Sequence, residues 1–139
     1  MLPLNNRLKK RKEFAYIYRN GVKYNSKNLS LVCVQSKLSE PRVGLSVSNK
    51  VGKAVVRNKI KRQLREIIKL ELNNLRIHQN FVLIAHPTIV ECDFSKLKAE
   101  VTALLKKGNL LNEHISKNNW FSSSNTLYCS YLYLQIYYK

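Results

Sequence analysis

The chain has 139 residues, enough for one domain with a hydrophobic core, and carries 25 Lys and Arg against 8 Asp and Glu, a formal net charge of +17. Such an excess is typical of nucleic-acid-binding proteins, and residues 1–107 hold 23 of the basic residues against 7 acidic ones. No apolar run is long enough to cross a membrane and residues 1–6 lack the apolar core of a signal peptide, so a cytoplasmic protein without membrane contact is expected.

The first predicted element is a short helix over about residues 12–19, which follows a basic run at residues 7–12. Gly21 is expected to end this helix in the left-handed conformation. Phe14, Ile17 and Tyr18 fall at i, i+3 and i+4 and therefore form one stripe. The pattern favours core packing for all three, although aromatic rings among cations also suit stacking on single-stranded bases.

Three strands are predicted, over residues 29–35, 42–48 and 81–86. The first and third are rich in apolar residues, and the third is stopped by Pro87. The second alternates, so that Gly44, Ser46 and Ser48 share its outward face. This flat face could be the floor of a groove for nucleic acid or an ordinary solvent-exposed surface.

The chain is organised around residues 50–69, which contain eight basic residues and one acid, Glu66. Apolar residues at helical spacing predict a helix over about residues 56–75 that buries one face. The basic residues on the neighbouring face recur at i, i+4 and i+8: Lys61, Arg65 and Lys69. Like charges at this spacing repel by about a few tenths of a kcal/mol per pair, and acidic partners are nearly absent. The helix therefore indicates a polyanionic partner rather than a solvated basic face.

A last helix is expected to begin at a capping Asp93 and to end at Gly108, with a buried stripe of Phe94, Leu97, Val101, Leu104 and Leu105. The order α-β-β-α-β-α predicts an α+β protein, a two-layer sandwich of helices and a small sheet. Residues 108–139 are poor in charge and rich in aromatic residues. They could form an added edge strand, a disordered tail or a partner-docking segment, so the domain is placed at 1–107 and the extension at 108–139.

Residues 42–66 resemble the protein subunit of bacterial ribonuclease P, through RVGLSVS, then Lys50, Gly52 and Ala54-Val55, then RNKIKR and RE. The segment from Asn6 to Gly21 is similar to the first helix of that family, and FVLIAHP and residues 94–105 to its last strand and helix. The resemblance covers about residues 5–107. It implies a ribosomal protein S5 domain 2-like fold with a left-handed βαβ crossover through the basic helix, an exception to the right-handed rule.

The resemblance also implies an endoribonuclease holoenzyme that removes the 5′ leader of precursor tRNA. A catalytic RNA subunit performs the hydrolysis with Mg²⁺, which the RNA and the substrate mainly hold, so no catalytic residue, metal site or protein partner is expected in this chain. The RNA subunit is expected to contact Lys50, Lys53, Arg57, Asn58, Lys59, Lys61 and Arg62. The leader is expected to lie between the first helix and the sheet, against Phe14, Tyr18, Lys61 and Arg65. With this implication, Phe14 and Tyr18 are expected to line the groove rather than to pack in the core.

The sequence departs from the family pattern at three positions of this surface. Lys59 stands where the family has Arg, and an ammonium group cannot form the bidentate fork that a guanidinium forms with a phosphate. Tyr18 stands where Phe is common and keeps the aromatic face. Val32 occupies a position where some members place an aromatic residue on the sheet.

Two alternatives remain open from the residues alone. A non-enzymatic RNA-binding module, such as a ribosomal protein or RNA chaperone, would share the basic helix. A nuclease with its own active site has little support, because paired carboxylates are absent and His86 beside Pro87 is more typical of a structural cap. A metal site or disulfide framework is not supported, because no ligand spacing links the remaining residues of these types: His78, His114, Cys33, Cys92 and Cys129.

Overall fold

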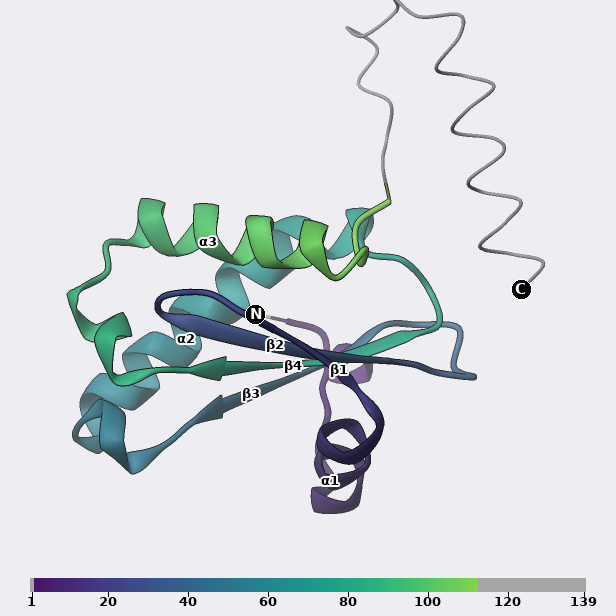
Figure 1. Ribbon diagram of the computed structural model, residues 1–139, viewed down its shortest axis with the longest axis horizontal. Helices are drawn as coiled ribbons and strands as arrows, with labels where there is room; N and C mark the ends of the chain where they lie inside the picture. The colour runs from purple at the N-terminus through teal and green to yellow at the C-terminus, as the bar shows by residue number, and fades with distance from the viewer. Residues whose placement is uncertain (1, 113–139) are drawn as a thin grey trace, which may run out of the picture.

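The computed structural model describes residues 2–112, which form a four-stranded sheet with α-helices on both faces (Figure 1). The helices are α1 (Arg11–Asn20), α2 (Ala54–Glu71) and α3 (Phe94–Lys107). The strands are β1 (Val22–Asn25), β2 (Leu29–Gln35), β3 (Arg42–Val47) and β4 (Gln79–Ala85). Short 3-10 segments lie at Leu4–Asn6, Asn49–Val51, Leu72–Asn74 and Pro87–Glu91.

The strand order is β1-β2-β4-β3. β1 and β4 each pair antiparallel with β2, whereas β3 pairs parallel with β4. The parallel pair is joined through α2, and the α+β class is confirmed. The handedness of this crossover stays a prediction. β1 was not predicted, because it has only four residues, three of them exposed, and therefore lacks the apolar run or clean alternation that marks a half-buried strand.

The larger core lies between α2, α3 and one face of the sheet. Ile60, Leu64 and Ile67 of α2 and Leu97 and Leu104 of α3 are among its buried residues. They recur at intervals of three, four or seven positions, as the period of 3.6 residues per turn requires. The predicted stripe of α3 is wrong at Phe94, which is 39% exposed because it lies at the first position of the helix. Asp93 is the N-cap residue, but its side chain makes no capping hydrogen bond.

A smaller core lies on the opposite face, where Ile17 of α1 packs with Val32, Val82 and Leu8. Figure 1 shows α1 alone below the sheet, with α2 and α3 on the other side. Gly21 ends α1 at φ −81°, so the predicted left-handed closure is wrong. The glycine is needed for space, because a Cβ there would lie 2.5 Å from the Ile17 carbonyl oxygen and 2.6 Å from a Val32 methyl carbon.

Glu100 of α3 fastens the β1–β2 turn to the larger core. Its carboxylate accepts hydrogen bonds from Ser26 Oγ at 2.6 Å, from the Asn28 backbone N–H at 2.7 Å and from Asn28 Nδ2 at 2.8 Å. Burial raises the pKa of Glu100, but these hydrogen bonds more than offset it, so its pKa lies below the ordinary value of 4.5. A carboxylate that accepts several hydrogen bonds is held in its ionised form.

The chain stays in the folded body beyond α3. Leu110 is 1% exposed and its carbonyl accepts a 2.7 Å hydrogen bond from the Arg76 backbone N–H, while Leu111 bridges Leu75. The core therefore continues past the boundary placed at residue 107. Residues 113–139, with the aromatic segment predicted to be a strand, tail or docking segment, lie outside the described residues. Within residues 2–112, no helix meets the length and apolarity that a membrane crossing requires.

Candidate nucleic-acid interface

The predicted contacts to the RNA subunit lie on one continuous segment, the 3-10 turn at Asn49–Val51 and the first half of α2. All of them point at least partly to solvent. Arg57 and Lys61 are half-buried, and the rest are exposed: Lys50, Lys53, Asn58, Lys59 and Arg62. The structure therefore brings these side chains together along one stretch of about two helical turns.

Within that stretch the side chains divide between two sides of α2. Arg57, Lys61 and Arg65 follow one another at i, i+4 and i+8 beside the buried stripe, and all three are half-buried. Lys59 is exposed and lies two positions from Arg57, so the two side chains do not face each other. The central motif thus spreads its charges around the helix, with a half-buried cationic row on one side.

Arg57 is the member of this row with an unusual environment. Its Nε is buried and has no hydrogen-bond partner within residues 2–112. Buried polar groups are nearly always paired with protein, water or a ligand. A guanidinium at the edge of a cationic helix is suited to a phosphate group, to two of whose oxygens it can donate two parallel hydrogen bonds.

The N-terminus of α2 adds a further positive field. Its first turn contains no acidic residue, and Lys53 occupies the N-cap. The exposed N–H groups of a helix start and its macrodipole both favour an anion there. Gly52 allows the chain to enter the helix at φ 155°, a conformation that side chains other than glycine rarely adopt.

The predicted leader-binding residues come from two different layers. Phe14 and Tyr18 lie on α1, whereas Lys61 and Arg65 lie on α2, which packs on the opposite face of the sheet. Phe14 is half-buried and covers Gly44, where a Cβ would lie 2.5 Å from its Cε1 atom. Tyr18 is 45% exposed. Part of the sheet face predicted to be open is therefore covered by Phe14, while Tyr18 is available to a ligand.

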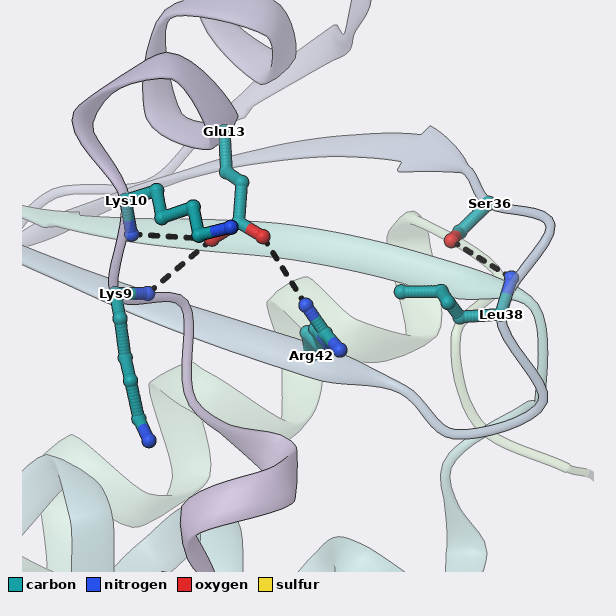
Figure 2. Close-up of polar contacts among 6 residues, drawn as sticks. All are labelled: Lys9, Lys10, Glu13, Ser36, Leu38 and Arg42. Atoms are coloured by element: carbon teal, nitrogen blue, oxygen red, sulfur yellow. Dashed lines mark hydrogen bonds and ion pairs between the residues drawn. The ribbon is translucent and has the colours of Figure 1, made fainter.

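An acidic residue that the pattern analysis did not single out holds α1 in place. The Glu13 carboxylate accepts hydrogen bonds from the backbone N–H groups of Lys10 at 3.1 Å and Lys9 at 3.3 Å, and from Arg42 Nη1 at 3.0 Å (Figure 2). Burial raises the pKa of Glu13, but these donors and the Arg42 charge more than offset it, so its pKa lies below the ordinary value of 4.5. Glu13 could have been singled out from the sequence, because it is the one acidic residue among residues 1–39.

The described residues offer no alternative metal centre. No group of three or more His, Cys, Asp or Glu within residues 2–112 could hold a metal ion. Cys33 and Cys92 are free thiols, and burial raises the pKa of each. Val32 stands where some members of the family have an aromatic residue. It is 4% exposed beneath α1 and cannot serve as a stacking platform for a base.

A mixed sheet with a half-buried cationic row on its crossover helix defines a small α+β RNA-binding protein. The family follows from comparison with known proteins. The model of the Ribonuclease P family matches residues 2–109, and the chain belongs to this family.

Relatives and solved structures agree with this assignment. The chain is 38% identical over 129 residues to the ribonuclease P protein component of Cyanothece sp., covering 81% of this chain and 98% of the relative. It is 40% identical over 107 residues to that of Caldanaerobacter subterraneus subsp. tengcongensis, covering 77% and 92%. The RNase P protein of Staphylococcus aureus matches with a TM-score of 0.73 at 29% identity, covering 77% of this chain and 98% of that one. The Thermotoga maritima protein matches with a TM-score of 0.68 at 28% identity, covering 73% and 96%.

The main prediction from sequence is thereby confirmed. The chain acts as the protein subunit of ribonuclease P, an endoribonuclease of tRNA processing in which the RNA subunit carries out catalysis. It associates with that RNA as part of a ribonucleoprotein. The two alternatives, a non-enzymatic RNA-binding module and a nuclease with its own active site, find no support among the relatives.

Proposed function

We propose that the segment from Lys50 to Arg62 binds the catalytic RNA, and that the 5′ leader of precursor tRNA lies on α1 and the adjoining sheet face and then passes the edge strand β3 to reach Lys61 and Arg65 of α2. The protein would do this in the cytoplasm. The Mg²⁺ ions of the reaction would be held mainly by the RNA subunit and the substrate.

The observation that carries this proposal is the uncompensated charge of α2. Arg57 leaves a buried donor unpaired within the described residues, and no acidic residue stands in the first turn of the helix. Burying part of a guanidinium without a partner costs free energy. The outer Nη groups of Arg57 are placed to donate to an RNA phosphate, and neutralising phosphates would also release counterions from the RNA.

The consequence for catalysis would be positional. A leader held on the protein adds contacts that mature tRNA, which has no leader, cannot make. Tyr18 can stack on an unpaired base, which contributes about 1–3 kcal/mol for an aromatic platform. Binding the leader also fixes the scissile phosphate near the metal ions of the RNA subunit, so the gain comes from orientation.

The test of RNA-subunit binding is Arg57→Ala, with Lys106→Ala on the exposed end of α3 as a matched loss of one positive charge. Arg57→Ala should weaken the RNA subunit roughly tenfold or more and flatten the dependence of log affinity on log salt by about one. Lys106→Ala should change neither. Equal effects of the two variants would show that only the total charge matters.

The test of leader binding is Arg65→Ala, measured in the reconstituted holoenzyme with precursor and mature tRNA. The variant should weaken precursor tRNA much more than mature tRNA. Equal losses for the two ligands would assign Arg65 a general electrostatic role and remove it from the leader site.

A further inference from the structure

The proposed leader surface contains a polar cluster whose residues neither the sequence analysis nor the family match assigned to RNA. It consists of Asn25 at the end of β1, Ser30 in β2 and His86 directly after β4. Asn25 pairs with Ser30, and Ser30 pairs with Ile84, across the strands. The cluster therefore spans three neighbouring strands on the sheet face that also carries α1.

This part of the face is not covered by α1. The helix packs over Gly44, Val82 and Val32, which form one row across the sheet. The next row towards the ends of β3 and β4 contains Ser46 and Ile84, which are both half-exposed. The cluster is thus on a surface that a bound strand could reach.

The hydrogen bonds within the cluster have a defined direction. Ser30 Oγ donates its single proton to Asn25 Oδ1 at 2.8 Å and lies 2.7 Å from His86 Nε2. With Asn25 Oδ1 as the acceptor of that proton, the matching tautomer of His86 carries its hydrogen on Nε2 and donates it to Ser30 Oγ. Ser30 is fully buried, so its hydroxyl holds the Asn25 and His86 side chains in place from the interior of the protein.

This direction determines what the cluster presents to solvent. In this tautomer the His86 ring offers Nδ1 as an acceptor, and no described residue donates to it. Asn25 uses its Oδ1 for Ser30 and is exposed, so its Nδ2 offers donors. A phosphate oxygen only accepts and would use half of this arrangement. A group that both donates and accepts, as a base edge or a ribose 2′-hydroxyl does, would use all of it.

We propose that Asn25 and His86, held by Ser30, form a hydrogen-bonding site for one leader nucleotide through a group that both donates and accepts. The inference rests on the proposed leader binding and names the residues that would read the nucleotide. Lys23 lies on the same face of β1, is exposed and supplies a positive charge for the neighbouring backbone. Ile84 contributes an apolar surface beside the polar pair.

The experiment uses the reconstituted holoenzyme with its RNA subunit and compares affinity for precursor tRNA with affinity for the same tRNA lacking its leader. His86→Ala and Asn25→Ala should each reduce the preference for the precursor about 2- to 12-fold, the range of one lost hydrogen bond. His78→Ala, an exposed histidine before the start of β4, is the matched control and should leave the preference unchanged. Thermal unfolding of each variant separates loss of the site from loss of the fold: Asn25→Ala and His86→Ala each leave the buried Ser30 hydroxyl with one partner fewer and should lower the Tm by only a few degrees, so both stay folded at the assay temperature.

Two sets of leaders identify the group that is read. Base substitutions at single leader positions should lower affinity for the wild type and not for His86→Ala if a base edge is bound. Single 2′-deoxy substitutions should do so if a ribose hydroxyl is bound. A wild type that prefers the precursor, with variants that keep that preference, would overturn this inference and leave the proposed leader binding intact. A wild type without the preference would refute both.

Discussion

Replacing Glu13 with Gln tests what positions α1 on the sheet. The substitution keeps the size of the side chain and leaves one oxygen as an acceptor. It removes the negative charge of the carboxylate, which accepts hydrogen bonds from the backbone N–H groups of Lys9 and Lys10 and from the Arg42 guanidinium. Because α1 holds Phe14 over Gly44, this charge also determines where the aromatic side of the proposed leader surface lies.

The magnitude follows from the geometry of the carboxylate. The ion pair with Arg42 is partly exposed, with 34% and 28% of the two side chains accessible, so it contributes at most about 1 kcal/mol. The two backbone N–H groups at the helix start add a capping contribution of about 1 kcal/mol. We expect Glu13→Gln to reduce the free energy of unfolding by about 1–2 kcal/mol, which corresponds to a fall in Tm of roughly 4–8 °C.

The assay is urea unfolding at neutral pH, with Glu40→Gln as the control. Glu40 is exposed and makes no ion pair or hydrogen bond among residues 2–112, so its loss should be within about 0.5 kcal/mol of zero. A double-mutant cycle with Arg42→Ala should show a coupling of about 0.5–1 kcal/mol. Equal costs for Glu13→Gln and Glu40→Gln, or no coupling, would refute the reasoning.

The pH dependence of stability supplies an independent check on the same residue. The pKa of Glu13 is lowered in the folded protein, so its contribution is present above the ordinary value of 4.5 and is lost as the pH falls below it. The wild type should therefore lose more stability than Glu13→Gln between pH 6 and acidic pH. Parallel curves for the two proteins would contradict a charged Glu13 in the fold.

Three further predictions follow from other contacts. Gly44→Ala should destabilise the protein by about 1–3 kcal/mol, because the new Cβ would meet the Phe14 ring, whereas Ser46→Ala on the same face should be nearly neutral; urea unfolding distinguishes the two. Glu100→Gln should reduce the free energy of unfolding by about 1–3 kcal/mol at pH 7 and by less below pH 4.5. The pKa of Glu100 is lowered in the fold, so the wild type itself loses this stabilisation in acid, and urea unfolding at both pH values measures the difference. Lys59→Arg should tighten RNA-subunit binding roughly threefold in a filter-binding assay, and no gain would show that Lys59 is not at a phosphate.

The helices and long strands could be predicted because their signal is local. The buried residues of α2 recur with the helical period, and its cations lie close together in sequence, so both the helix and its cationic surface could be predicted without coordinates. β2 was predicted with its observed bounds because it is rich in apolar and β-branched residues. β1 was missed, since a four-residue edge strand with mostly exposed side chains has no such signal.

The features that could not be predicted depend on contacts far apart in sequence. Glu13 meets Arg42 across 29 positions, and Glu100 meets Ser26 across 74. Whether α1 lies over Gly44 depends on which face of the sheet the helix occupies, and the strand pattern alone leaves this open. The proposed site at His86 depends likewise on three strands that meet only in the folded sheet.

The central claim is that this chain binds the RNA subunit through the basic residues in the first half of α2 and thereby supports cleavage by that RNA. The most direct measurement is processing of precursor tRNA by a bacterial ribonuclease P RNA at limiting Mg²⁺, with no protein, with the wild type and with Arg57→Ala. The wild type should restore 5′-leader removal, Arg57→Ala should require a higher protein concentration to do so, and the protein without RNA should be inactive. Cleavage by the protein alone, or equal activity of the wild type and Arg57→Ala at every concentration, would contradict the account.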